Sequence, residues 1–460
     1  MQKYKLFRNL FFFKPIDYLF ITILNKELFL GIDFVYLYIK IILIMLYKLK
    51  QLVFFLLTST LAFSQVIEVN PPDYIKTITF KSQNSSQGEL PIIKLNEPFY
   101  LEFDALGRDE PDFYYTIEQY NYDWTPSLLV KAEYLIGLDN LRILSWRNSF
   151  NTFQPYSHYR LDLPNNQTKQ IKLTGNYLIT IRDEEDKIVF TRKFIIYEDK
   201  VNIKLDIKRS RDVTKIDVMQ TVDMEISGAL KFNNPSQTVN TTIIQNRNYN
   251  TAIKNLKPQY IVGDKLIYRY INETAFLGGN EFLFFETKNP RAALNGVEST
   301  ELKDLNNSYL REDIKRADLN YTFAPDINGR FKITAVDVDD INIEADYVNV
   351  HFSLNIPKIK PNERIFVYGN YNNYALEENN ELLFDNESGN YTTMLKLKQG
   401  FYNYQYVILK KDGSLDHGRI SGDFWQTENN YKVIVYYRDL GARYDKVLGF
   451  SEISSTKIKN

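Results

Sequence analysis

The stretch TGNYLITIRDEEDKIVFTRKFIIY, residues 174–197, decides the fold of this chain. Large apolar residues occupy every second position from Tyr177 to Ile181, and the same alternation returns from Ile188 to Phe194, with Arg192 at one of its positions, after the turn-rich DEED. Alternation with a period of two predicts two strands with one buried face, joined as a β-hairpin. The preceding segment SFNTFQPYSHYRLDLPN, residues 149–165, ends in a similar strand pattern. Together these strands predict the closing half of an immunoglobulin-like β-sandwich.

The rest of the chain extends this pattern. A length of 460 residues exceeds one ordinary core, and 34 Tyr and 31 Phe with only 19 Gly favour strands over long helices. We therefore predict an all-β protein of tandem immunoglobulin-like or early-set β-sandwich domains. The expected parts are a leader (1–64), a first immunoglobulin-like sandwich (65–199), a second β domain (200–345) and a third, early-set immunoglobulin-like sandwich (346–460).

Residues 45–64 have the pattern of a secretory signal peptide. Lys48 and Lys50 form a positive region, residues 52–63 are apolar, and small residues precede a cleavage site after Ser64. The simplest interpretation is that translation begins at Met45 and that residues 1–44 are spurious, the alternative being an N-terminal membrane anchor. We expect the mature chain to lie beyond the inner membrane and to have no membrane span.

The residue types exclude several classes of chemistry. The chain has no cysteine, which excludes thiolate catalysis, disulfides and Cys-ligated metals. A formal net charge of −1 does not suggest a nucleic-acid partner. His158, His351 and His417 lie far apart in the sequence, and none has a second histidine at metal-ligand spacing. No nucleophile elbow, phosphate loop or dinucleotide-binding turn occurs. We predict a non-enzyme without cofactor, metal, nucleic acid or small-molecule ligand.

Two further segments carry structural predictions. LNYTFAPDINGRFKITAVDV, residues 319–338, is predicted to be a hairpin across the turn from Asp326 to Gly329. Residues 295–315 are expected to form the only short helix, or else an extended loop, in the second β domain.

Several ordered phrases in the chain resemble a known family. They are Ser-Phe-Asn-Thr (149–152), His-Tyr-x-Leu-x-Leu-Pro-Asn (158–165), Gly-Asn-Tyr (175–177), Gly-Gly-Asn-Glu-Phe (278–282), Asp-Ile-Asn-Gly (326–329) and Asp-Tyr-Val-Asn-Val-His-Phe (346–352). The whole string, from Val66 to Phe450, resembles the plug protein family of the type IX secretion system. This resemblance implies a periplasmic protein that binds the periplasmic mouth of the outer-membrane translocon barrel and seals it while no cargo is engaged.

The predicted contacts with the barrel lie on loops at the ends of the sandwiches, at residues 104–111, 124–126 and 150–157. The candidate partner-binding residues are Trp124, Phe150, Phe153 and Tyr156. The translocon barrel is the expected partner, and the periplasm, next to the outer membrane, is the expected location.

A glycan-binding protein is the alternative function. The third domain resembles early-set sandwiches that bind starch and glycogen, in which aromatic rings stack on sugars. Tyr371, Tyr374 and Trp425 are the candidate platform here. Tyr374 stands where such modules usually have a tryptophan, and the same aromatic residues could equally belong to a core.

Overall fold

The computed structural model describes residues 40–51, 65–228 and 232–458. The chain divides into two compact units, residues 1–64 and 65–460. In the first unit residues 40–51 are helical, and among the described residues no helix is long and apolar enough to cross a membrane. The signal-peptide prediction for residues 45–64 falls largely on residues 52–64, which lie outside the described residues.

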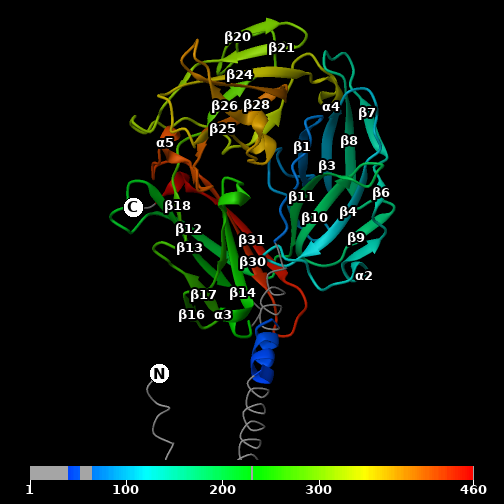
Figure 1. The fold of residues 1–460 in the computed structure, drawn as a ribbon, viewed down its shortest axis with the longest axis vertical. Helices are drawn as coiled ribbons and strands as arrows, with labels where there is room; N and C mark the ends of the chain where they lie inside the picture. Colours follow the sequence, from blue (N-terminus) through cyan, green and yellow to red (C-terminus); the bar gives the residue numbers. More distant parts are fainter. Residues whose placement is uncertain (1–39, 52–64, 229–231, 459–460) are drawn as a thin grey trace, which may run out of the picture. The chain divides into compact units, whose positions relative to one another are not determined.

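The second unit is built from β-sheets joined by short helices, so the all-β prediction is confirmed. Figure 1 shows three groups of strands, around β3 and β10, around β13 and β14, and around β24 and β28. The immunoglobulin-like topology stays a prediction.

The first group is a sandwich of two sheets around one core. One sheet has the order β1 (Ile75–Ser82), β3 (Phe99–Leu106), β8 (Tyr156–Leu163), β7 (Ser145–Asn148). The other has the order β2 (Ile92–Lys94), β11 (Ile188–Tyr197), β10 (Gly175–Arg182), β4 (Tyr114–Tyr120), β6 (Leu141–Arg142). The helix α2 (Lys131–Tyr134) precedes β5 (Leu135–Gly137), which pairs with β9 (Thr168–Ile171). The predicted hairpin is confirmed as β10 and β11, whose register pairs Tyr177 with Phe194.

The second group also has two sheets. One has the order β12 (Asn202–Arg209), β13 (Met219–Ser227), β17 (Lys265–Tyr268), β16 (Tyr260–Val262), with β18 (Ala275–Leu277) on β13. The other has the order β15 (Ile253–Leu256), β14 (Val239–Gln245), β30 (Asn430–Tyr437), β31 (Lys446–Ser454). The short helices α3 (Pro235–Thr238), η1 (Tyr249–Thr251) and η4 (Ser455–Lys457) adjoin these strands.

The third group is a connected sheet system of eleven strands. Its main order is β19 (Leu283–Glu286), β28 (Gly400–Leu409), β25 (Arg364–Tyr368), β26 (Glu381–Phe384), β27 (Tyr391–Lys398), β24 (Tyr347–Asn355), β21 (Asn306–Leu310), β20 (Val297–Leu302). β22 (Asp313–Ile314) pairs with β24, while β23 (Phe331–Ile333) and β29 (Leu415–Asp416) pair with β28. The helices are α4 (Ile341–Glu344), α5 (Gly418–Ser421), η2 (Asn370–Asn372) and η3 (Glu378–Asn380).

Strand pairing crosses the predicted boundary between residues 345 and 346. β14 pairs with β30 along its whole length, from Val239 opposite Tyr437 to Gln245 opposite Tyr431. In Figure 1 the red strands β30 and β31 accordingly lie beside the green strand β14. Since these strands share hydrogen bonds and a core, the last part of the chain completes the second group. The division into separate domains at 199/200 and 345/346 stays a prediction.

Two local predictions are wrong. The residues before the Asp326 turn are not a strand, and β23 after it pairs with β28 instead of forming a hairpin. The Asp326 carboxylate accepts a hydrogen bond from the Asn328 amide at 2.6 Å and another from Phe282 N, which ties the turn to a distant loop. Residues 297–310, expected as a helix or loop, form the paired strands β20 and β21.

Glu89, in the loop before β2, lies among three cations from other parts of the chain. Its carboxylate oxygens are 2.8 Å from Arg247 Nη2, 3.0 Å from Arg330 Nη1 and 3.2 Å from Lys432 Nζ. Burial raises the pKa of Glu89, but Arg247 above all, together with Lys432 and Arg330, lowers it to about 2. This charge cluster joins the first group of strands to the other two.

An apolar cluster joins the first two groups next to these charges. Its buried members come from both sides: Tyr120, Trp124, Leu178, Ile195, Ile244, Ile434, Tyr436 and Val447. Close-packed side chains between the groups hold the first sandwich firmly against β14 and β30.

Candidate partner-binding loops

Two of the three predicted loops meet at one end of the first sandwich. Residues 104–111 comprise the end of β3 and the loop after it, and residues 150–157 comprise the loop before β8 and the start of that strand. Because β3 and β8 are antiparallel neighbours with Leu106 opposite Tyr156, these two loops share one edge of the sheet. The Gly107 amide donates to the Pro155 carbonyl at 2.9 Å. The loops frame an open groove of about 650 Å³, whose lining includes Arg108, Glu110, Phe153 and Arg291.

Phe150 and Phe153 present their rings to solvent beside this groove, with 67% and 50% of each residue exposed. Their backbones are nevertheless held in place. Phe150 N donates to the Ile343 carbonyl at 2.8 Å, and Phe153 N donates to the Asp346 carboxylate at 2.7 Å. Because the backbone is anchored, little backbone entropy is lost when a partner binds. Exposed aromatic side chains are also among the residues that interfaces favour.

Tyr156 does not belong to this exposed set, and its prediction as a contact residue needs correction. Only 1% of Tyr156 is exposed, and its hydroxyl donates to the Ala345 carbonyl at 2.8 Å. Its ring packs edge-on against Tyr347, with the ring centroids 5.4 Å apart. Tyr156 therefore fastens the first sandwich to the start of β24, and although it lines the groove it offers almost no exposed surface to a partner.

Trp124 is likewise a buried junction residue, with 2% exposure. Its Nε1 donates to the Tyr249 hydroxyl at 2.6 Å, and the Lys193 ammonium lies 4.6 Å from its ring centroid. The loop 124–126 does not contribute to the lining of the groove. Because Trp124 is buried, as Tyr156 is, the prediction that Trp124 contacts a partner directly is also corrected.

A buried charge network lies beneath the two loops. Asp104 is completely buried and accepts hydrogen bonds from Tyr347 at 2.7 Å and from Lys398 at 2.8 Å. Its other oxygen is 2.7 Å from His158 Nδ1. Burial raises the pKa of Asp104, but Lys398 and His158 together hold it below its usual range. The network keeps the base of the loops rigid.

His158 therefore has a structural partner. Burial lowers its pKa, but the carboxylates of Asp104 and Glu102 outweigh burial and raise it. In the described part of the chain, no group of three or more His, Cys, Asp or Glu side chains is placed to hold a metal ion.

The three residues of the glycan hypothesis do not form a platform. Tyr374 is 2% exposed and donates its hydroxyl to the Asn246 carbonyl at 2.8 Å. Tyr371 donates to the Val367 carbonyl at 3.0 Å, and the guanidinium of Arg209 covers Trp425 at 4.5 Å from the ring centroid. Because each ring packs against other protein groups, a sugar cannot stack across all three.

Sequence reasoning missed the residues that complete the site from other segments. Arg291 reaches the groove from the loop after β19, and Asp346 anchors the loop 150–157 from the start of β24. No local pattern marks either residue, since their positions depend on how distant strands pack.

Comparisons with known proteins agree with this architecture. A family model for the first domain of the type 9 secretion system plug protein matches residues 75–198. The crystal structure of a hypothetical protein from Parabacteroides merdae is 31% identical, with a TM-score of 0.81, and the alignment covers 85% of this chain and 100% of that one.

Two other solved structures align with little similarity in space. The C-terminal domain of an antigen I/II-family protein from Streptococcus pyogenes is 8% identical, with 83% and 99% of the two chains covered and a TM-score of 0.17. The B domain of a biofilm-associated protein is 10% identical, with 85% and 88% covered and a TM-score of 0.16. Neither supports a conclusion about fold, and no curated protein matches the chain.

The matched residues 75–198 span the first sandwich, from β1 to the end of β11. They include both loops at the groove and most of the ordered phrases from the first part of the chain. The chain belongs to the type 9 secretion system plug protein family.

Proposed function

We propose that this protein is a periplasmic plug that binds the periplasmic mouth of the type IX outer-membrane translocon barrel and seals it while no cargo is engaged. The plug-family match over residues 75–198 carries the proposal. The matched sandwich also bears the loops 104–111 and 150–157, on which Phe150 and Phe153 are exposed.

The architecture supports this function physically. A seal has to resist deformation, and the first sandwich is tied to the rest of the chain by an apolar cluster and two buried charge networks. Reversible binding requires a modest interface with an anchor in its centre. In this proposal Phe150 and Phe153 are the anchor, and Arg108, Glu110 and Arg291 form a polar rim.

Co-purification tests the binding. The tagged protein, expressed from Met45, is recovered from mild-detergent extracts of its own cell envelope, as wild type and with Phe150→Asp and Phe153→Asp together. We expect the wild type to recover a very large outer-membrane barrel and the double variant to recover about tenfold less. The unfolding midpoint should not change, because both rings are exposed.

Phe323→Asp is the matched control, since this phenylalanine is 59% exposed but belongs neither to the loops 104–111 and 150–157 nor to the lining of the groove. It should recover the barrel as the wild type does. Full recovery with the double variant would reject the placement at these loops, and failure of the wild type to recover any barrel would reject the function.

Sealing is tested separately in cells that lack the protein. Uptake of a small hydrophilic dye across the outer membrane should rise and should return to normal when the wild-type protein is supplied. Unchanged uptake would contradict a sealing role while leaving a binding role open to the first experiment.

A further inference from the structure

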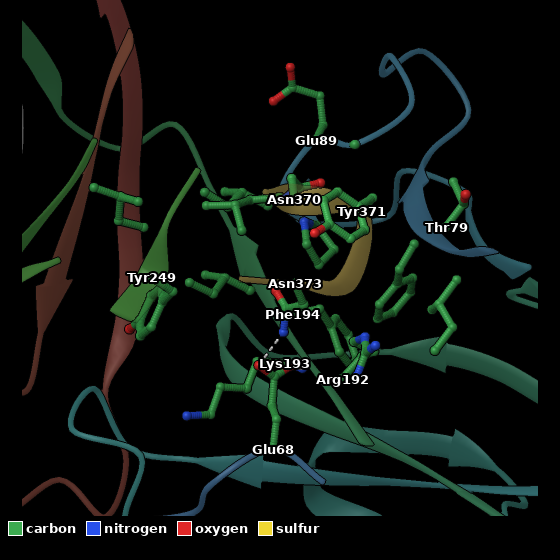
Figure 2. Close-up of a pocket in the computed structure, with 18 of the residues that line it drawn as sticks. Glu68, Thr79, Glu89, Arg192, Lys193, Phe194, Tyr249, Asn370, Tyr371 and Asn373 are labelled. Carbon is green, nitrogen blue, oxygen red and sulfur yellow. Dashed lines mark hydrogen bonds between the residues drawn. The ribbon is translucent and has the colours of Figure 1, made fainter. Parts of the chain in front are cut away.

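Two adjoining cavities that share lining residues lie between β1, β11, η2 and β27. Their volumes are about 80 and 320 Å³, and both are lined by Ile78, Arg192, Phe331 and Tyr371. Figure 2 shows the smaller one, with Arg192, Lys193 and Phe194 on one side and Asn370, Tyr371 and Asn373 on the other. The larger has the size of a small-ligand site.

Arg192 is the unusual residue of this wall. It is 9% exposed, and its Nη1 donates to the carbonyl of its own neighbour Thr191 at 2.8 Å. Its guanidinium carbon lies 5.4 Å from the Phe190 ring centroid. Within the described residues it forms no salt bridge, and burial lowers its pKa. A guanidinium has five N–H donors, and a buried charge is costly unless it is paired.

The two acidic residues that face Arg192 are occupied by other partners. One oxygen of Glu68 accepts from Lys193 N at 2.6 Å, and the other accepts from Asn373 Nδ2 at 2.9 Å, the dashed bond in Figure 2. Glu377 N donates to Asn380 Oδ1 at 2.8 Å at the start of η3, and the Glu377 carboxylate is hydrogen-bonded by the side chain of Asn372. The guanidinium therefore has donors left for an anion that the chain does not supply.

The other residues that line the larger cavity indicate the charge of the anion and the chemical group attached to it. Lys398 also lines the cavity but is already paired with Asp104, and the remaining charged lining has three basic residues, Lys76, Arg192 and Lys396, against two acidic ones, Asp73 and Glu377. Its apolar lining includes Ile75, Ile78, Leu106, Phe331, Leu395 and Leu397. The excess of basic groups favours a single negative charge, and the apolar wall favours a hydrocarbon part beside it.

We propose that this cavity binds a small organic carboxylate with a short hydrocarbon tail, with the carboxylate on Arg192 and the tail against β1 and β27. Short fatty acids and the C-terminal carboxylates of apolar peptides share this chemistry. The proposal differs from the expectation, made from the sequence, that no small molecule binds, and it does not depend on the plug function.

Isothermal titration calorimetry with defined probes tests the proposal. The probes are sodium hexanoate and N-acetyl-leucyl-leucine, each with its neutral counterpart, hexan-1-ol or the peptide amide. We expect at least one carboxylate to bind the wild type and its neutral counterpart to bind about tenfold more weakly. Binding of hexanoate would indicate a short fatty acid as the ligand, and binding of the dipeptide would indicate a peptide C-terminus. Absence of binding by both acids up to about 10 mM would overturn the proposal.

Arg192→Met removes the charge and keeps the apolar stem, and it should weaken binding about tenfold. Arg182→Met is the matched control, because Arg182 is on the neighbouring strand β10 and lines neither cavity. It should bind as the wild type does. The proposal would be overturned if Arg192→Met bound the carboxylate as tightly as the wild type, or if Arg182→Met lost as much affinity as Arg192→Met.

Met394→Trp keeps the proposal testable if Arg192→Met does not fold. Met394 lines the larger cavity and is 46% exposed, so a larger side chain there narrows the entrance without disturbing a core. This variant should lose affinity while Arg192 stays in place. Wild-type affinity in Met394→Trp would contradict the assignment of the cavity.

Discussion

Replacement of Glu89 by glutamine removes the one acidic group shared by Arg247, Arg330 and Lys432. Arg247 and Lys432 are each 4% exposed, so water cannot replace the lost carboxylate. Glu452 remains at 2.5 Å from Lys432 and at 3.8 Å from Arg247. The variant should therefore fold, but with a smaller free energy of unfolding.

The pKa of Glu89 sets the magnitude. It falls from 4.5 to about 2 in the folded protein, and each pKa unit corresponds to about 1.4 kcal/mol, so the ionised carboxylate contributes about 3 kcal/mol. Removal of one partner from a buried ion pair typically costs about 3–5 kcal/mol, and the value of about 3 kcal/mol for Glu89 agrees with this range. The side chain is 14% exposed, so solvent screening reduces this contribution only slightly.

The sign of the pH dependence follows from the lowered pKa. The contribution of Glu89 is complete above its unfolded pKa of 4.5 and disappears as the pH falls toward about 2. The difference in unfolding free energy between wild type and Glu89→Gln should be about 3 kcal/mol at pH 7 and about 1.4 kcal/mol at pH 3.

Urea unfolding of both proteins at several pH values measures this difference. The control is Asp199→Asn, which removes one partner of an exposed pair with Lys94 and should leave the unfolding free energy nearly unchanged. A loss below about 1 kcal/mol for Glu89→Gln at pH 7, or a loss independent of pH, would refute the reasoning.

Three further perturbations test other parts of the structure. Asp104→Asn leaves Lys398 buried without its counter-ion and should lower the unfolding free energy by about 3–5 kcal/mol. Urea unfolding measures this change, and a loss of less than about 1 kcal/mol would contradict the prediction. Trp124→Phe loses the hydrogen bond to Tyr249 and should lower the unfolding free energy by about 1–3 kcal/mol. An unchanged thermal unfolding midpoint would contradict a stabilising role of Trp124 at this junction. Burial raises the pKa of Asp326 to about 7, so the wild type should gain stability relative to Asp326→Asn as the pH falls from 7 to 4; a constant difference would contradict this shift.

The positions of many strands could be read from the sequence. In the first sandwich the alternation of large apolar residues marked β8, β10 and β11, because side chains on a strand point alternately to opposite faces. The same reasoning failed around Asp326, where the turn residues were identified correctly but the expected partner strand was not. Turn chemistry is local, whereas β23 is paired by a strand about 70 residues further along.

The candidate site was predicted only in part. The loops 104–111 and 150–157 were named from the sequence, and the exposed rings of Phe150 and Phe153 lie there. Trp124 and Tyr156 carry the same kind of side chain on similar loops but are buried. An aromatic residue in a polar loop has the same sequence signature whether it faces solvent or a neighbouring sheet, so the packing of that sheet decides its role.

The sequence by itself determined the all-β class, the inward faces of the strands, the absence of disulfides and the resemblance to the plug family. These properties depend on residue types and on a period of two, which are local. The tertiary structure alone decided that β14 pairs with β30, that Lys398 neutralises Asp104 and that Arg192 faces a cavity. Such contacts join residues up to hundreds of positions apart, and they depend on the joint packing of several sheets, which no local pattern encodes.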